Sequence, residues 1–232
     1  MAKTTKYQKK IAASHNLAKI YPLAEAIDLA KQTHSAKFDA AVDIAVNLGV
    51  NPQKADQMVR GTVTLPHGTG KVPRVLVICS EDKEKEAKDA GADHVGNEVY
   101  LKKLEGGWSD IDVIVTMPAL MAKLGRLGKV IGPKGLMPNP KSGTVTTDIG
   151  KAVQEIKSGK ISFRVEKSGI IHMSVGRASF EKEKLQENIE EVMHVITRLK
   201  PVSLKGTYIK KIAISTTMGP GIQVDSQSIN TK

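Results

Sequence analysis

The chain has 232 residues, 40% of them hydrophobic and 25% charged, which excludes a disordered or fibrous protein. Lys and Arg number 35 against 24 Asp and Glu, so the formal net charge is +11 and nucleic acid is the first expected partner. No apolar run reaches the roughly 18 residues of a membrane span, and one cysteine cannot form an internal disulfide, so we expect a cytoplasmic monomer with no membrane role.

The N-terminal segment predicts two helices. Ile11, Leu17 and Ile20 are spaced loosely along one helical face. Pro22 then has the position of a residue that opens a second helix. The segment is rich in lysine, so we interpret the first of these helices as basic and amphipathic.

The hydrophobic period then changes to that of a strand. Hydrophobic residues occupy every second position over residues 38–46, beginning with Phe38, which is the pattern of a strand with one buried face. Asn51 followed by Pro52 resembles a helix N-cap and first helical residue. Residues 61–65 are predicted to form another strand.

A different pattern begins at residue 68. Residues 75–79 form a continuous apolar strand, followed by a charged helix over residues 82–89. A second helix at 99–104 and a second apolar strand at 113–115 complete a β-α-β arrangement. These elements predict a small parallel sheet layered with helices.

The C-terminal part returns to alternating strands and helices. After a helix at residues 149–156, two strands at 161–165 and 170–175 are predicted to form a hairpin. Hydrophobic residues then recur at helical spacing over residues 185–199, and Pro201 ends that helix. A last strand is predicted over residues 209–217.

These patterns predict an α+β domain and an α/β domain in one chain. Residues 1–67 and 160–232 are expected to form one discontinuous domain, and residues 68–159 an inserted one. Two connections close together would permit hinge motion between the two domains.

Two motifs suggest other functions. Residues 68–71, Gly-Thr-Gly-Lys, resemble part of a phosphate-binding loop, but Val72 follows in place of Ser or Thr and the next strand comes later, which disfavours a nucleotide-using enzyme. Residues 131–135 resemble the GXXG loop of KH domains, which bind single-stranded RNA, but Pro138 and Pro140 would block the second helix. Both remain as alternatives.

The residue types of catalysis and metal binding are present without a pattern. The six histidines and Cys79 show no metal-like spacing, and no G-x-S-x-G nucleophile motif occurs. We therefore expect a protein that is not an enzyme and that needs neither a metal nor another cofactor.

A long segment without acidic residues is the most informative feature of the charge pattern. No Asp or Glu occurs between Asp112 and Asp148, where five cations alternate with glycines. These cations are Lys123, Arg126, Lys129, Lys134 and Lys141. Glycine allows main-chain N–H groups to approach phosphates and cations displace counterions, so the segment favours contact with an RNA backbone.

Four segments together resemble one family. Residues 37–50, 60–68 (RGTVTLPHG), 127–141 and 216–220 (TTMGP) closely resemble bacterial members of the L1 family of ribosomal proteins, and the run GPKGLMPNPKSGTV at residues 132–145 is especially specific. The resemblance covers essentially the whole chain. It implies a split β-α-β domain made from both termini and an inserted Rossmann-like, three-layer α/β domain.

The resemblance also implies a function. Members of the family bind large-subunit ribosomal RNA at the mobile side stalk and assist the release of deacylated tRNA from the exit site. They also repress translation by binding their own messenger RNA. The expected partners are therefore ribosomal RNA, messenger RNA and exit-site tRNA.

Site residues follow from the same resemblance, position by position. The implied RNA-reading surface contains Lys37, Phe38, Lys167, His172, Thr216, Thr217, Met218 and Gly219. Phe38 and Met218 would contact sugar or base faces, while the Thr hydroxyls and the Gly219 backbone would bind 2′-hydroxyls and phosphates. Secondary contacts to the RNA backbone are expected from Lys71, Arg126, Lys134 and Lys141. Lys134 stands where Arg is common in the family, which keeps the charge but not a bidentate phosphate contact.

Overall fold

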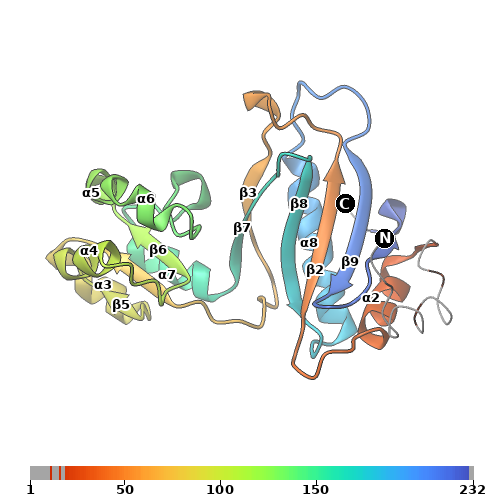
Figure 1. Ribbon diagram of the computed structural model, residues 1–232, viewed down its shortest axis with the longest axis horizontal. Coiled ribbons are helices and arrows are strands. Elements are labelled where there is room, and N and C mark those ends of the chain that lie inside the picture. Colours follow the sequence, from red (N-terminus) through yellow and green to blue (C-terminus); the bar gives the residue numbers. More distant parts are fainter. Residues whose placement is uncertain (1–10, 12–15, 17–18, 230–232) are drawn as a thin grey trace. The chain divides into compact units, whose positions relative to one another are not determined.

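The computed structural model describes Ile11, Asn16 and residues 19–229, and these form a mixed α/β protein, which confirms the expected class (Figure 1). The chain divides into two compact units. Unit 1 consists of Met1–Gly70 and Phe163–Lys232, and unit 2 of Lys71–Ser162. None of the described helices is long and apolar enough to cross a membrane.

The main element of unit 1 is a five-stranded sheet in the order β1-β10-β9-β2-β8. The strands are β1 (Ile20–Tyr21), β2 (Ala41–Leu48), β8 (Ile170–Arg177), β9 (Ile209–Thr216) and β10 (Ile222–Val224). Strand β1 is parallel to β10, and the other neighbours are antiparallel. The inner strand β2 therefore pairs with β8, which lies after the inserted unit in the sequence, and with β9, which lies near the C-terminus.

Two helices, α2 (Leu23–Gln32) and α8 (Lys182–Arg198), cover one face of this sheet (Figure 1). The alternation expected for β2 is confirmed, because every second residue from Val42 to Leu48 is buried. The expected 3.6-residue spacing of α8 is also confirmed, with Leu185 and Ile196 among its buried residues. The opposite face of the sheet is left without a covering helix among the described elements.

A two-stranded sheet pairs β3 (Arg60–Thr64) with β7 (Lys160–Arg164), the strand in which the chain passes from unit 2 back to unit 1. Because β7 pairs with β3 and β8 pairs with β2, the predicted hairpin of β7 and β8 is wrong. The N–H of Val165 donates to the carbonyl of Val59 at 2.9 Å and extends this pairing. A 3-10 turn, η1 (Ala55–Gln57), precedes β3.

Unit 2 is a three-stranded parallel sheet between two layers of helices. The strand order is β5-β4-β6, with β4 (Val75–Ile78), β5 (His94–Val95) and β6 (Val113–Thr116). Side chains of α3 (Glu84–Asp89) and α7 (Ile149–Lys157) pack on one face. Side chains of α4 (Glu98–Glu105), α5 (Met121–Arg126) and α6 (Gly128–Ile131) pack on the other. All four residues of β4 are buried, which is why this strand is continuously apolar.

Three expectations for the N-terminal part need correction. Ile20 belongs to strand β1 and not to a helix, and Leu17 lies outside the described residues. Phe38 lies in a bend, because the strand begins at Ala41. Asn51 does not begin an α-helix; its side chain accepts a hydrogen bond from the N–H of Gln53 at 3.1 Å and closes a local turn.

The basic, acid-free segment between Asp112 and Asp148 is partly helical. Helices α5 and α6 contain Lys123, Arg126 and Lys129, although glycines occur within both. Ile131 is buried against the unit 2 core, and no α-helix follows Gly135 before α7 in this described segment. The helix-loop-helix arrangement of a KH domain is therefore absent at this motif.

Candidate nucleic-acid interface

One end of the unit 1 sheet brings together two predicted segments that are far apart in the sequence. Strands β2 and β9 are antiparallel, with Val42 opposite Thr216, so the chain enters β2 and leaves β9 at the same end. The N–H of Thr217 donates to the carbonyl of Ala41 at 2.9 Å. The bend with Lys37 and the turn after β9 are therefore joined by main-chain bonding.

The turn after β9 presents an exposed apolar side chain. The N–H of Gly219 donates to the carbonyl of Thr216 at 2.8 Å, which closes a four-residue turn. Met218 has a φ of 67° and is the one residue other than glycine with positive φ in the described parts of the chain. Its side chain is 79% exposed. The backbone of Met218 is therefore strained by about 1 kcal/mol, and its flexible thioether side chain faces solvent.

Thr216 has a different environment from its neighbours. Its side chain is only 3% exposed, and its hydroxyl is buried without a hydrogen-bond partner. A Cβ on Gly219 would lie 2.2 Å from that hydroxyl oxygen. The Thr216 side chain therefore fills the space beneath the turn, and glycine at 219 is required by this close approach.

The bend before β2 is held by the chain that follows β8. The carboxylate of Asp39 accepts hydrogen bonds from the N–H and the hydroxyl of Ser179 at 3.0 and 2.9 Å. Arg177 donates to the carbonyl of Asp39 at 3.2 Å. Beside this anchor the side chain of Lys37 is exposed, and that of Phe38 is 53% exposed.

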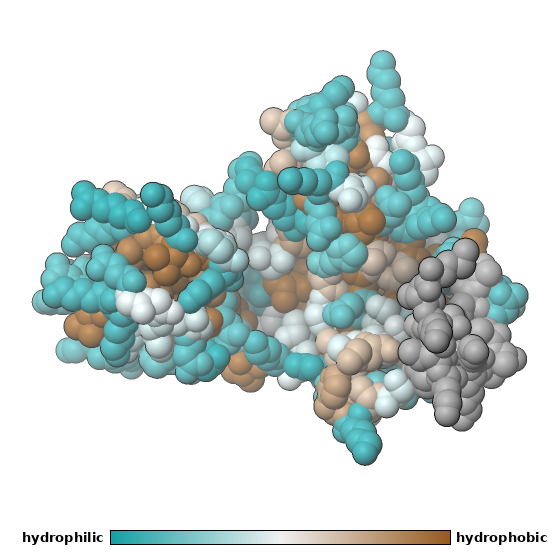
Figure 2. Space-filling model, viewed as in Figure 1, coloured by the Kyte–Doolittle hydropathy of each residue, from teal (hydrophilic) through white to brown (hydrophobic). Residues whose placement is uncertain are grey.

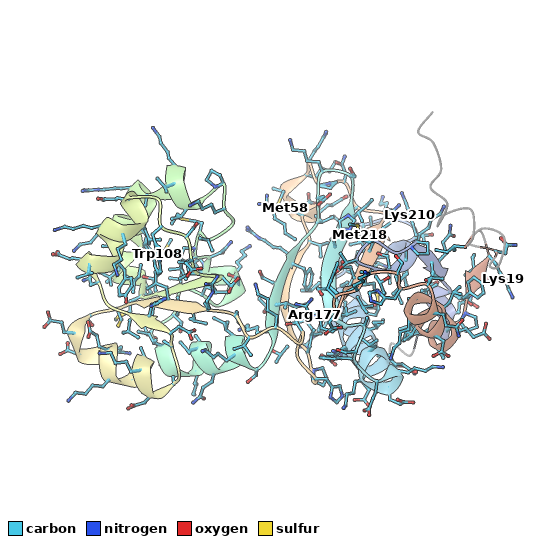
Figure 3. All side chains as sticks on the ribbon, turned by 60° about the horizontal axis from the view of Figure 1, so that its bottom comes forward. Lys19, Met58, Trp108, Arg177, Lys210 and Met218 are labelled. Atoms are coloured by element: carbon cyan, nitrogen blue, oxygen red, sulfur yellow. The ribbon has the colours of Figure 1, made fainter. Side chains whose placement is uncertain are left out.

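Arg177 is a candidate site residue that the sequence reasoning missed. It is the last residue of β8 and pairs with Ala41, so it lies at the same end of the sheet as Phe38 and Met218. Arg177 and Met218 are labelled in Figure 3. Nothing in the sequence pattern indicates that β8 pairs with β2, so its proximity to these residues could not be inferred from spacing.

Lys167 lies at the opposite end of the sheet. Strand β8 runs antiparallel to β2, so the turn before β8 follows the other end of β2, where the N–H of Leu48 donates to the carbonyl of Gly169 at 2.9 Å. The eight residues of β2 separate the two ends by roughly 25 Å at about 3.3 Å per residue. The structure thus divides the predicted reading surface into two groups.

His172 lies between these groups, on the uncovered face of the sheet. It pairs with Ala45 on β2, its side chain is exposed, and its Nε2 atom is 3.9 Å from a carboxylate oxygen of Glu166. Other side chains of this face include Asp43, Asn47, Ile170, Ser174, Lys211, Ala213, Ser215 and Gln223, which are partly or fully exposed. Figure 2 shows hydrophilic side chains gathered over the loops at the top of this unit.

The predicted secondary contacts of unit 2 have different surroundings. Lys71 donates to a carboxylate oxygen of Asp112 at 2.6 Å, and the other oxygen accepts from the N–H of Arg74 at 2.9 Å. Both bonds lower the pKa of Asp112, and the bond from Arg74 has the larger effect. Lys71, Arg126 and Lys141 all have exposed side chains, and that of Lys71 forms an ion pair with Asp112.

In unit 2, Lys134 contacts Gly107, and the next residue, Trp108, belongs to an aromatic cluster. The ammonium of Lys134 donates to the carbonyl of Gly107 at 2.9 Å. The rings of His94 and Trp108 meet edge to face with centroids 5.1 Å apart, and Tyr100 lies 5.9 Å from Trp108 (Figure 3). A chain with only 3% aromatic residues gave no sequence signal for this cluster.

Among the residues that the structure describes, no group of three or more His, Cys, Asp or Glu side chains could hold a metal ion. The arrangement in unit 1 instead offers exposed apolar side chains, main-chain groups and cations around a flat polar face. Such a surface can bind a folded RNA by its shape and backbone.

Comparisons with known proteins agree with this chemistry. Residues 30–220 match the model of the ribosomal protein L1p/L10e family. The chain is 58% identical to the large ribosomal subunit protein uL1 of Amoebophilus asiaticus over 98% of both chains. It is 56% identical to the protein of the same name from Bacteroides fragilis over 99% of both chains. It is 57% identical to that of Flavobacterium psychrophilum over 99% of this chain and all of the relative.

Proposed function

Because this chain belongs to the ribosomal protein L1 family, whose members are structural and not catalytic, we propose that it binds ribosomal RNA at the mobile side stalk of the large subunit. It is a ribosomal structural constituent. The nucleotide-using enzyme considered from residues 68–71 is therefore wrong, and Lys71 is engaged with Asp112.

We infer that the two units correspond to two domains with different roles. Residues 1–67 and 160–232 would form the discontinuous, split β-α-β domain that binds RNA, and residues 68–159 the inserted Rossmann-like domain. The three-layer arrangement of unit 2 and the pairing of β2 with β8 and β9 support this division.

The observation that carries the proposal is the hydrogen bond between Thr217 and Ala41, which places the Phe38 bend and the Met218 turn at one end of an uncovered sheet face. Phe38 and Met218 would contact sugar or base faces, with Lys37 on a phosphate. The Thr217 hydroxyl and the Gly219 backbone would bind 2′-hydroxyls. Buried Thr216 would support the turn.

A second group would contact the same RNA farther along β2. Lys167, in the turn before β8, and His172, on the uncovered face, would bind the backbone there. In unit 2, exposed Arg126 and Lys141, together with Lys134 and Lys71, would make secondary backbone contacts that raise affinity without selecting sequence.

Three further roles belong to this proposal. The protein would assist the release of deacylated tRNA from the exit site, and it would repress translation of its own messenger RNA by binding a structure similar to the ribosomal one. It would act in the cytoplasm as part of the ribosome. Support for these roles comes from the family membership and the +11 charge.

The test compares the wild type with a Thr217→Ala, Met218→Ala double variant on a folded stalk RNA and an unstructured RNA of equal length, at physiological salt. We expect the wild type to prefer the folded RNA and the double variant to fall to the affinity for the unstructured one. Val99→Ala, a change at an exposed residue of α4, is the matched control and should bind as the wild type does. A wild type without preference would refute the proposal.

A further inference from the structure

A groove of about 940 Å³ lies in unit 1 between the loop before β3 and the turn that connects β7 to β8. Pro52, Met58 and Val165 supply its apolar lining, and Gln53, Arg164 and Lys167 its polar lining. Met58 is labelled in Figure 3. The volume lies in the range of about 300–1,000 Å³ that is typical of small-molecule sites.

The walls of the groove are fixed by local hydrogen bonds. On one side, the side-chain oxygen of Gln57 accepts from the N–H of Asn51 at 2.9 Å, which closes the loop that contains Gln53. On the other side, the N–H of Glu166 donates to the carbonyl of Ile170 at 2.9 Å and closes the turn between β7 and β8. A ligand would therefore meet a preformed site and would not have to order these loops.

The lining combines the groups that one nucleotide needs. Pro52 and Met58 offer apolar surface for a base, and the Gln53 amide can both donate to and accept from a base edge. Arg164 donates from Nη2 to the Met58 sulfur at 3.3 Å, which leaves its other N–H groups for a phosphate. Exposed Lys167 adds a second cation, while the single acid of the lining, Glu166, is 3.9 Å from His172.

We propose that this groove receives one unstacked nucleotide of the RNA that unit 1 binds. The base would lie on Pro52 and Met58, and its flanking phosphates would contact Arg164 and Lys167. The inference rests on the proposed function. It is favoured because Lys167 belongs both to the groove and to the second group of contacts along β2, so RNA on the uncovered face reaches the groove. Proteins read single-stranded loops and bulges through such splayed bases.

A crosslinking experiment on the full chain locates the nucleotide. Cys79 is the one cysteine of the sequence and is buried, so Gln53→Cys introduces a selectively accessible thiol for a benzophenone maleimide. Gln32→Cys, exposed at the end of α2 on the covered side of the sheet, is the matched control. With folded stalk RNA, we expect the Gln53→Cys conjugate to crosslink to one unpaired nucleotide or its direct neighbours, and the control conjugate to give only background.

A thermodynamic cycle then tests whether the base occupies the groove. Removing the base at the crosslinked nucleotide should weaken wild-type binding about tenfold, as expected for one stacked base. Met58→Ala should weaken binding to the intact RNA and should reduce the effect of base removal, because the two changes delete a shared contact. Each variant is compared with the wild type in urea unfolding so that loss of fold is recognised.

The outcomes separate this inference from the function on which it rests. If crosslinks are spread over paired nucleotides, or if base removal and Met58→Ala act independently, the groove holds no base, although the preference for folded RNA stands. If free mononucleotide competes for the Gln53→Cys crosslink as well as the RNA does, the groove is a small-molecule site and the inference is overturned. If the wild type does not prefer folded RNA, both proposals fail.

Discussion

The N–H of Thr217 donates to the carbonyl of Ala41 across 2.9 Å and joins residues 176 positions apart in the sequence. The Thr217 hydroxyl oxygen also lies 3.4 Å from the same carbonyl. Because a bend with Phe38 precedes Ala41 and an exposed Met218 follows Thr217, this contact makes two short segments into one surface. Changes on either side are therefore expected to affect the same RNA contact.

Replacing Phe38 by alanine should reduce RNA affinity without loss of fold. The side chain is 53% exposed, so its removal should change the free energy of unfolding by less than about 0.5 kcal/mol. Affinity for folded stalk RNA should fall at least about tenfold, which is the scale of one stacking contact. Urea unfolding and equilibrium binding measure the two effects. A variant that binds as the wild type does would show that Phe38 lies outside the interface.

Met218→Gly should separate backbone strain from side-chain contact. Glycine adopts a φ of 67° without strain, so the variant should unfold at the wild-type urea concentration or slightly above it, yet it should bind folded RNA more weakly. Met218→Val, whose branched Cβ disfavours positive φ, should lose about 1–2 kcal/mol of stability as well as affinity. Wild-type affinity in the glycine variant would remove Met218 from the interface.

Thr216→Val tests the buried hydroxyl beneath the turn. Valine has nearly the same shape and removes a hydroxyl that has no hydrogen-bond partner, so stability should rise by about 1 kcal/mol. RNA affinity should stay within about twofold of wild type, since the hydroxyl is inaccessible. A strong loss of affinity would mean instead that RNA binding exposes this oxygen.

The buried phenol of Tyr208 should make the protein less stable in alkali. Its hydroxyl donates to the carbonyl of Ile196 at 3.1 Å. Burial raises its pKa from the ordinary 10.0 to about 12, so the folded protein holds the phenol proton more tightly than the unfolded chain does. This difference in pKa contributes fully to the stability of the folded state below pH 10, and the contribution is lost as the pH rises toward 12.

Urea unfolding of wild type and Tyr208→Phe at pH 8 and pH 11 measures this effect. At pH 8 the variant should be less stable by about 1 kcal/mol, because it lacks the hydrogen bond. At pH 11 the difference should shrink or reverse, because phenylalanine has no proton to lose. Equal pH dependence of the two proteins would contradict the role of Tyr208 burial.

The elements that the sequence predicts well are those with one clear hydrophobic period. Val42, Ile44 and Val46 alternate, and the buried face of α8 repeats at helical spacing, so both were predictable within a few residues. Helices α5 and α6 were not, because their glycines disfavour helix and packing on the unit 2 core stabilises them instead.

The spatial arrangement of the candidate site could not be predicted from the sequence. The separation of Lys167 from Phe38 and the nearness of Arg177 follow from strand order, which hydrophobic periodicity does not contain. The burial of Thr216 could be predicted from the sequence. Ile212 and Ile214 point into the core, and the same alternation places Thr216 inward.

The position of β9 in the sheet sets an order for the synthesis of the protein. Unit 2 is continuous, so it leaves the ribosome as a complete sequence, whereas β2 must wait for residues 209–216 before both of its edges are paired. A nascent chain that ends before β9 has an open strand edge, a known site of aggregation, and lacks the Met218 turn. A truncated product of this kind therefore lacks part of the surface that we propose for RNA binding.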